Sequence, residues 1–129
     1  MGEERRGLRV LVVDDDANIR LLTAEVLIEA CCRVFTAADG EEAVEILERE
    51  PVDLLVTDYE MPRMNGLELI RWSRARLPHL PTVLITGHEP ETVVAEGWRC
   101  GTLRMLRKPF SVEHLLLLVG ELCGAALTI

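Results

Sequence analysis

Three consecutive carboxylates, Asp14, Asp15 and Asp16, end the apolar run at residues 8–13. Like charges about 4 Å apart repel by roughly 4 kcal/mol at an effective dielectric of about 20, so this cluster is costly unless something offsets it. A hard divalent cation with oxygen ligands, Mg²⁺ foremost, is the natural offset for such a group. The cluster therefore points to a metal site, although Asp16 alone is better explained as a carboxylate at a helix N-terminus.

Three further side chains that could take part in a reaction follow or end other apolar runs, namely Asp58, Thr86 and Lys108. A carboxylate, an ammonium and a hydroxyl beside a metal suit phosphoryl transfer. The cations would stabilise charge on the phosphoryl oxygens, and an aspartate could attack phosphorus to give an aspartyl phosphate. Thr86 could then hydrogen-bond a phosphoryl oxygen. That contact would exist only in the modified state, which is what a switch needs.

These residues need a scaffold that brings them together, and the apolar pattern supplies one. Strand-length apolar runs recur at residues 8–13, 33–37, 52–57, 81–86 and 103–107. Between them lie segments with helical spacing, for example Ile19, Leu22 and Val26. Five alternations of strand and helix predict an α/β fold, a parallel sheet covered on both faces.

The composition of the runs also predicts the strand order. Runs 8–13, 52–57 and 81–86 are nearly all apolar, as buried central strands should be, whereas 33–37 and 103–107 are more polar and suit the edges. This matches the doubly wound, flavodoxin-like order 2-1-3-4-5, whose crevice lies outside the carboxyl ends of strands 1 and 3. Asp14, Asp15, Asp58, Thr86 and Lys108 should therefore gather at one rim.

Boundary residues and composition complete this interpretation. Asp39 and Ser111 stand where helix N-caps belong, and Gly97 predicts a short helix within residues 89–100. The cysteines lack the paired spacing of a zinc site, which favours buried thiols in a reducing cytoplasm. A net charge of −8 leaves no basic stripe for nucleic acid, and the longest aliphatic stretch, residues 115–119, is too short to span a bilayer.

Four pieces of the chain, in order and at consistent spacing, resemble the receiver domain of two-component response regulators, the CheY-like family. They are VVDDD (12–16), DLLVTDYEMPRMNGLELI (53–70), VLITGH (83–88) and LRKPF (106–110). The resemblance covers about residues 8–123. It leaves an N-terminal extension at 1–7 and a C-terminal tail at 124–129.

The resemblance implies that Asp58 accepts a phosphoryl group from a sensor histidine kinase or a histidine phosphotransfer domain. It implies Mg²⁺ held by Asp15, Asp58 and the backbone carbonyl of Glu60, with Asp14 orienting a metal-bound water. Lys108 would pair with Asp58 or its phosphoryl group and precede a cis peptide to Pro109. Such a domain is not a conventional enzyme, because it catalyses its own phosphorylation and dephosphorylation.

In this family the fourth helix, fifth strand and fifth helix form a face that binds downstream partners or mediates dimers. Trp98, Leu103 and Met105 would lie there, and core packing explains them equally well. Met105 stands where the family usually has a Tyr or Phe that moves inward on phosphorylation. Cys31 replaces a common glycine in the turn after the first helix, and Glu60 and His88 flank the phosphoryl position and should tune dephosphorylation.

Two other functions fit part of the pattern. A Mg²⁺-dependent phosphohydrolase of the haloacid dehalogenase type would use the DxD formed by Asp14 and Asp16. This chain has Asn18 where such enzymes carry Thr or Val, and it has no length for a cap domain. A pseudo-receiver would bind partners regardless of phosphorylation. The complete set of site residues argues against that function, and Met105 argues mildly for an altered output.

Overall fold

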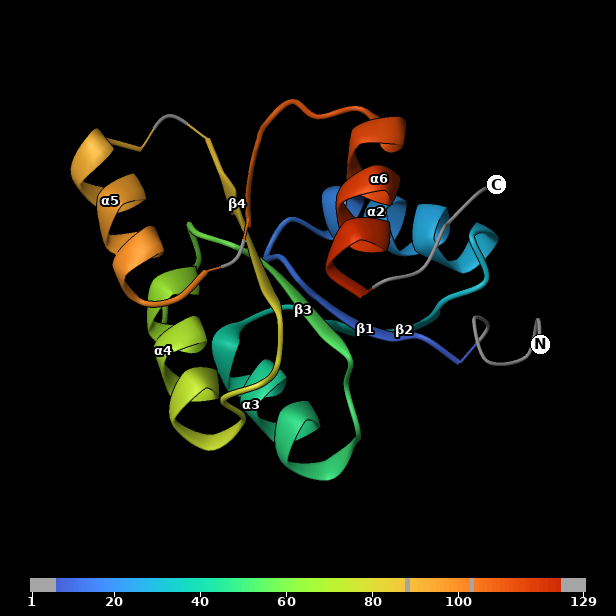
Figure 1. Cartoon of the computed structure of the whole chain (residues 1–129), viewed down its shortest axis with the longest axis horizontal. Helices are drawn as coiled ribbons and strands as arrows, with labels where there is room; N and C mark the ends of the chain where they lie inside the picture. The colour runs from blue at the N-terminus through green and yellow to red at the C-terminus, as the bar shows by residue number, and fades with distance from the viewer. Residues whose placement is uncertain (1–6, 88, 103, 124–129) are drawn as a thin grey trace.

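The computed structural model describes residues 7–87, 89–102 and 104–123, in which strands and helices alternate along the chain (Figure 1). The strands are β1 (Arg9–Val13), β2 (Arg33–Ala37), β3 (Leu54–Asp58), β4 (Thr82–Thr86) and β5 (Arg104–Arg107). The helices are α2 (Ala17–Glu29), α3 (Gly40–Arg49), α4 (Gly66–Arg76), α5 (Glu91–Arg99) and α6 (Val112–Cys123).

All strand pairs are parallel, and the sheet has the order β2-β1-β3-β4-β5. The predicted flavodoxin-like order is therefore confirmed. Every residue of β3 and β4 is buried, whereas β2 and β5 each expose two positions. The difference follows from placement, because an edge strand has a neighbour on one side only.

Helices cover both faces of the sheet (Figure 1), and an apolar layer fills the space between helices and sheet on each face. The alternating side chains of β1 show the division. Val10 and Val12 pack with α2 and α6, whereas Leu11 and Val13 pack with α3 and α4. The aliphatic stretch at 115–119 is core as expected except Leu117, which is 65% exposed.

Side-chain caps begin the helices where the sequence predicts them. The Asp39 carboxylate accepts a hydrogen bond from the Glu42 N–H at 2.8 Å, and the Ser111 hydroxyl accepts one from the His114 N–H at 3.0 Å. Helix α5, which contains Gly97, has nine residues and is the shortest helix in the described part of the chain. These caps fix the starts of α3 and α6 at the carboxyl edge of the sheet.

Three expectations about the chain's periphery have different outcomes. The tail at 124–129 and, apart from Gly7, the extension at 1–7 lie outside the described residues. Cys31 is exposed, so the expectation that the cysteines are buried is wrong for this one, because it lies in a surface turn. No helix in the described ranges is long and apolar enough to cross a membrane.

Cys31 adopts the left-handed backbone conformation that the missing glycine suggests, with φ of 72°. The Cys31 N–H donates to the Ile28 carbonyl and the Cys32 N–H donates to the Leu27 carbonyl, so both close the end of α2 as a Schellman motif. Helix α5 ends in the same pattern, with Gly101 at φ of 94° in the equivalent position. Left-handed backbone costs a non-glycine residue about 1–2 kcal/mol.

Substituting Cys31→Gly is therefore expected to raise the free energy of unfolding by about 1 kcal/mol. Little packing is lost, because Cys31 is exposed. Urea unfolding of the two proteins measures the difference. Cys31→Ala is the matched control and should show no comparable gain, since alanine keeps the Cβ that the conformation disfavours. A gain of equal size for alanine would contradict the backbone explanation.

Candidate functional site

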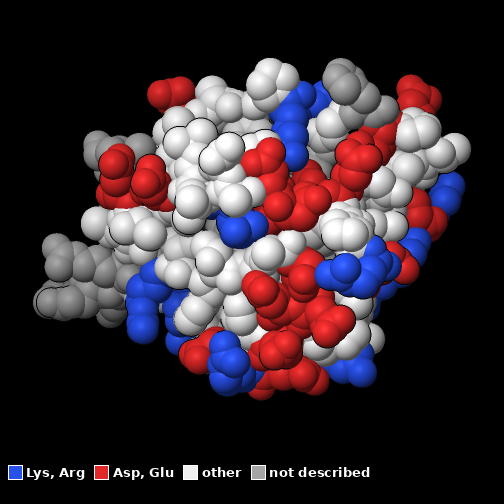
Figure 2. Space-filling model, turned by 180° about the vertical axis from the view of Figure 1, so that it is seen from behind, with Lys and Arg blue, Asp and Glu red and all other residues white. Residues whose placement is uncertain are grey.

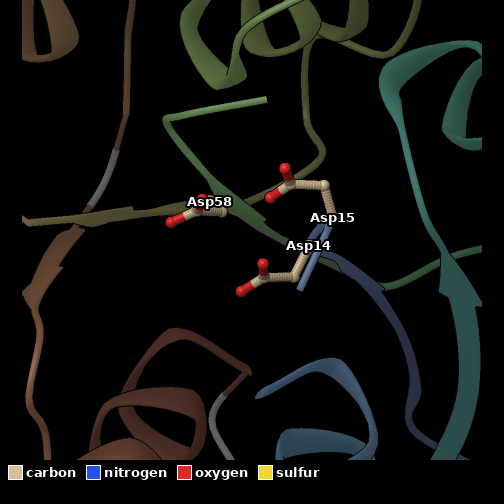
Figure 3. A group of neighbouring side chains, drawn as sticks. All are labelled: Asp14, Asp15 and Asp58. Carbon is tan, nitrogen blue, oxygen red and sulfur yellow. The ribbon is translucent and has the colours of Figure 1, made fainter. Parts of the chain in front are cut away.

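The ends of β1 and β3 form the centre of the carboxyl rim. Val13 pairs in register with Thr57, so Asp14 and Asp58, which follow these residues, lie side by side. Carboxylate oxygens of Asp14, Asp15 and Asp58 all lie within 4.8 Å of one another, as a group at the strand ends (Figure 3). Asp14 and Asp58 are buried and Asp15 is exposed, so the group opens to solvent on one side.

The two oxygens of the Asp14 carboxylate have different surroundings. Oδ1 accepts a hydrogen bond from the Asp16 N–H at 2.9 Å. Oδ2 is buried with no hydrogen-bond partner among the described residues, and Lys108 Nζ lies 3.7 Å from it, too far for a hydrogen bond. A buried carboxylate oxygen without a donor is costly. Three carboxylates with such an oxygen among them fit a hard divalent cation.

Lys108 supplies a positive charge next to Asp58 in this group of carboxylates. Its Nζ lies 3.0 Å from Asp58 Oδ1, and it is the single lysine of the chain. Its backbone N–H donates to the Thr86 carbonyl at 2.8 Å, which ties the end of β5 to the end of β4. The peptide bond from Lys108 to Pro109 is cis, as the resemblance implies.

Burial governs the protonation of the site. Burial raises the pKa of Asp58 to about 6, helped by the charges of Asp14 and Asp15, although the hydrogen bond from Lys108 opposes the rise. Burial also raises the pKa of Asp14. For Lys108, burial disfavours the ammonium, but the hydrogen bond and charge of Asp58 outweigh burial and raise its pKa. Without a metal, the site thus holds more negative charge than Lys108 balances.

This imbalance predicts how the metal-free protein responds to pH. Between its unfolded pKa of 3.8 and its folded pKa of about 6, Asp58 keeps a proton in the folded state that the unfolded chain has lost. The free energy of unfolding should therefore fall by about 3 kcal/mol as pH rises through this window, and the loss persists above it. Asp58→Asn lacks this dependence. It should be more stable than the wild type at pH 7.5 by about 3 kcal/mol, with the difference vanishing near pH 4.

Urea unfolding in EDTA at several pH values measures both proteins. Asp53→Asn is a matched control, because Asp53 is bonded to Arg9 and its pKa is lowered, mainly by the hydrogen bond from Arg9. That variant should lose stability at neutral pH. An Asp58→Asn protein less stable than the wild type at pH 7.5 would contradict the electrostatic account.

The remaining predicted residues lie at or near the rim. Thr86 is the last residue of β4, buried, and adjacent to Ile85, which pairs in register with Asp58. Asp16 caps α2 by accepting hydrogen bonds from the Asn18 and Ile19 N–H groups, so it serves the helix and lies outside the carboxylate group. Glu60 is exposed, and its carbonyl as a metal ligand stays a prediction. The predicted role of His88 falls outside the described residues.

Sequence reasoning missed one residue that holds the rim in place. Arg20 on α2 donates from Nη1 to the Asp14 backbone carbonyl at 2.7 Å. This bond fixes the chain where it leaves β1, which positions both Asp14 and Asp15. No sequence signal identifies Arg20, because its partner is a backbone atom that every residue has.

Met105 on β5 is half-buried and packs on the layer that contains Leu67 and Leu84. A β-carbon built on Gly97 would overlap the Met105 methyl group, so the methionine lies directly against the backbone of α5. Trp98 on the same helix is 52% exposed, whereas the predicted contribution of Leu103 lies outside the described residues.

The chain is similar to known proteins over most of its length. The family model of the response regulator receiver domain matches residues 10–119. The DNA-binding transcriptional regulator NtrC of Escherichia coli K12 is 34% identical over 115 residues, which cover 89% of this chain and 24% of that protein. The chain thus spans about a quarter of the length of this curated relative.

Shorter relatives match over most of their own length. Sporulation initiation phosphotransferase F of Bacillus subtilis is 28% identical over 107 residues, covering 83% of this chain and 86% of that protein. Among solved structures, the chemotaxis response regulator CheY4 of Vibrio cholerae aligns with a TM-score of 0.83 at 31% identity, covering 90% of this chain and 98% of that one.

Proposed function

The chain belongs to the response regulator receiver family, and from this membership we propose that Asp58 accepts the phosphoryl group that controls its signalling state. The observation that carries the assignment to Asp58 is its position. It is a buried carboxylate with Lys108 Nζ at 3.0 Å and two further carboxylates within 4.8 Å. Asp14 and Asp15 belong to the same group, but neither has a cation as close among the side chains that the structure describes.

In the proposed reaction the Asp58 carboxylate attacks the phosphorus of a phosphohistidine. The phosphorus–nitrogen bond breaks, the imidazole leaves with the bonding pair, and an acyl phosphate forms on Asp58. The Lys108 ammonium balances negative charge on the phosphoryl oxygens. Hydrolysis returns Asp58 as a carboxylate and releases inorganic phosphate, so the modification is reversible.

Asp14, Asp15, Asp58 and the Glu60 carbonyl are the residues that we propose hold Mg²⁺. The ion would supply positive charge that neutralises the carboxylates and the transferred phosphoryl group. The unpartnered Asp14 Oδ2 supports this assignment, because a cation or its bound water would satisfy it. Asp15 opens to solvent and provides the side from which the ion enters.

The contacts of Thr86 suggest how phosphorylation of Asp58 would change the surface that partners bind. Its hydroxyl would donate to a phosphoryl oxygen on Asp58, and its backbone is bonded to Lys108 at the start of the segment that follows β5. Movement of Thr86 would then change the face formed by α5, β5 and α6, where Trp98 is exposed. Met105 would transmit the change in place of the usual aromatic ring, because its side chain lies against α5.

Receiver domains interact with histidine kinases or phosphotransfer proteins and with downstream effectors. We place the effector site on the α5–β5–α6 face, which a second copy of the chain would also use in a homodimer. Figure 2 shows acidic side chains gathered in patches on one face and basic side chains mostly scattered, which suits cations and basic protein surfaces more than nucleic acid. We place the protein in the cytoplasm, with residues 8–123 as the receiver unit.

The test is intact mass after incubation with acetyl phosphate and Mg²⁺. The wild type should gain one phosphoryl group, whereas Asp58→Asn and an EDTA-treated wild type should gain none. Asp16→Asn is the matched control, because asparagine caps a helix as well as aspartate and the Asp16 side chain lies outside the carboxylate group. It should be phosphorylated like the wild type. No adduct on the wild type under any condition would favour the pseudo-receiver function.

A further inference from the structure

The chain that leaves β4 is held immediately after Thr86 by two ionisable side chains. The Gly87 N–H donates to Glu89 Oε1 at 2.6 Å. The Gly87 carbonyl accepts from Arg107 Nε at 3.2 Å. Both polar groups of one backbone residue are therefore bonded to charged side chains, which makes these hydrogen bonds stronger than neutral ones. Neither bond belongs to the strand ladder or to a helix.

Gly87 lies beside the site that the proposed function uses. It is two residues beyond Ile85, the register partner of Asp58. Lys108, whose Nζ is 3.0 Å from Asp58 Oδ1, donates its backbone N–H to the carbonyl of Thr86, the residue immediately before Gly87. A phosphoryl group on Asp58 would thus lie close to the Gly87 N–H, which is the first backbone donor after Thr86.

We infer that Glu89 gates phosphorylation by occupying the Gly87 N–H until a phosphoryl oxygen on Asp58 displaces it. The inference rests on the proposed function. Carboxylate and phosphoryl oxygens seek the same donors, since both are anionic acceptors. In the unmodified protein Glu89 satisfies this N–H from within the chain, and Arg107 holds the carbonyl of the same residue. Phosphorylation must break the Glu89 bond before the Gly87 N–H can donate to the new group.

Glu89 is a positioning residue on this account, because it acts through the Gly87 backbone. Its half-buried carboxylate also adds negative charge next to the place where an anionic donor arrives. Occupation of the donor and charge repulsion both oppose the modified state. They can be separated, because glutamine keeps an acceptor oxygen for the Gly87 N–H and removes the charge.

The test measures the affinity of the Mg²⁺-loaded protein for beryllofluoride, a small-molecule analogue of a phosphoryl group on a carboxylate. Calorimetry compares the wild type with Glu89→Ala, Glu89→Gln and Glu91→Ala. Glu89→Ala should bind about fivefold more tightly, which is the ratio that one modest hydrogen bond produces. Glu89→Gln should fall between it and the wild type. Glu91→Ala should match the wild type, because Glu91 is exposed in the first turn of α5.

Two outcomes would contradict the proposed role of Glu89. The first is an affinity of Glu89→Ala within about twofold of the wild type. The second is equal tightening in Glu89→Ala and Glu89→Gln, which would assign the effect to charge alone. The Mg²⁺ affinity, measured on the same proteins, should change less than the beryllofluoride affinity, since Glu89 lies outside the carboxylate group. The unfolding midpoint of the free Glu89→Ala protein should fall slightly, because this variant loses the bond to the Gly87 N–H. Failure of the wild type to bind beryllofluoride or to form a phosphoryl adduct would instead overturn the proposed function.

Discussion

Replacing Lys108 with alanine is expected to slow phosphorylation of Asp58 by acetyl phosphate about a hundredfold. The ammonium lies 3.0 Å from Asp58 Oδ1, where it would stabilise the charge on the transferred phosphoryl group. Its removal also takes away a hydrogen bond that lowers the pKa of Asp58, so a smaller fraction of this carboxyl would be ionised and able to attack. The rate of adduct formation, followed by intact mass, measures the effect.

Lys108→Arg is the matched variant for this prediction. Arginine keeps the positive charge but places it on a planar group with a different hydrogen-bond geometry, so we expect a smaller loss than with alanine. Because Lys108 is the single lysine, reductive methylation with ¹³C-formaldehyde labels its Nζ together with the N-terminal amine alone. The Nζ methyl signal should shift on phosphorylation. A Lys108→Ala protein phosphorylated at the wild-type rate would contradict the assigned role.

Gly66→Ala is expected to lower the free energy of unfolding by about 3 kcal/mol. Gly66 begins α4, and its N–H donates to the Tyr59 carbonyl at 2.9 Å, which brings the helix against the end of β3. A β-carbon at Gly66 would overlap the Asp58 carbonyl oxygen and lie 2.8 Å from Leu84 Cδ1. Backbone on one side and a buried strand on the other leave no room for adjustment. Urea unfolding measures the loss.

Gly87→Ala is the control for this substitution. A β-carbon there would meet Glu89 Oε2 at 3.6 Å, an ordinary van der Waals distance. We expect its stability to stay within about 1 kcal/mol of the wild type, as for a glycine replaced where the backbone is compatible. If Gly66→Ala were as stable as Gly87→Ala, α4 would have to be free to move away from β3. The close packing of α4 against the end of β3, the strand that carries Asp58, would then be wrong.

The strand order and the rim were predictable from the sequence because both follow from simple rules. Arg104 and Arg107 mark an edge strand, since a strand buried on both faces has no place for two guanidinium groups. Once the order is known, the carboxyl ends of parallel strands meet at one edge, which brings Asp14 close to Asp58. The pairing of Lys108 with Asp58, in contrast, was implied by the family resemblance.

Features that depend on backbone partners could not be predicted. Arg20 on the Asp14 carbonyl, and Glu89 and Arg107 on Gly87, leave no pattern in the sequence, because any residue supplies the same backbone atoms. Boundaries shift for a similar reason. The run at 52–57 predicts a strand from Val52, but β3 begins at Leu54, because the Asp53 carboxylate turns back to accept hydrogen bonds from Arg9.

We expect Asp58, among three neighbouring carboxylates, to be the residue that carries the phosphoryl group. Borohydride reduces an acyl phosphate to an alcohol, so treatment of the phosphorylated wild type followed by peptide mass mapping marks the modified aspartate. Reduction should occur at Asp58 alone, and at no aspartate when Mg²⁺ is removed before acetyl phosphate is added. Reduction at Asp14 or Asp15 instead of Asp58 would contradict this expectation.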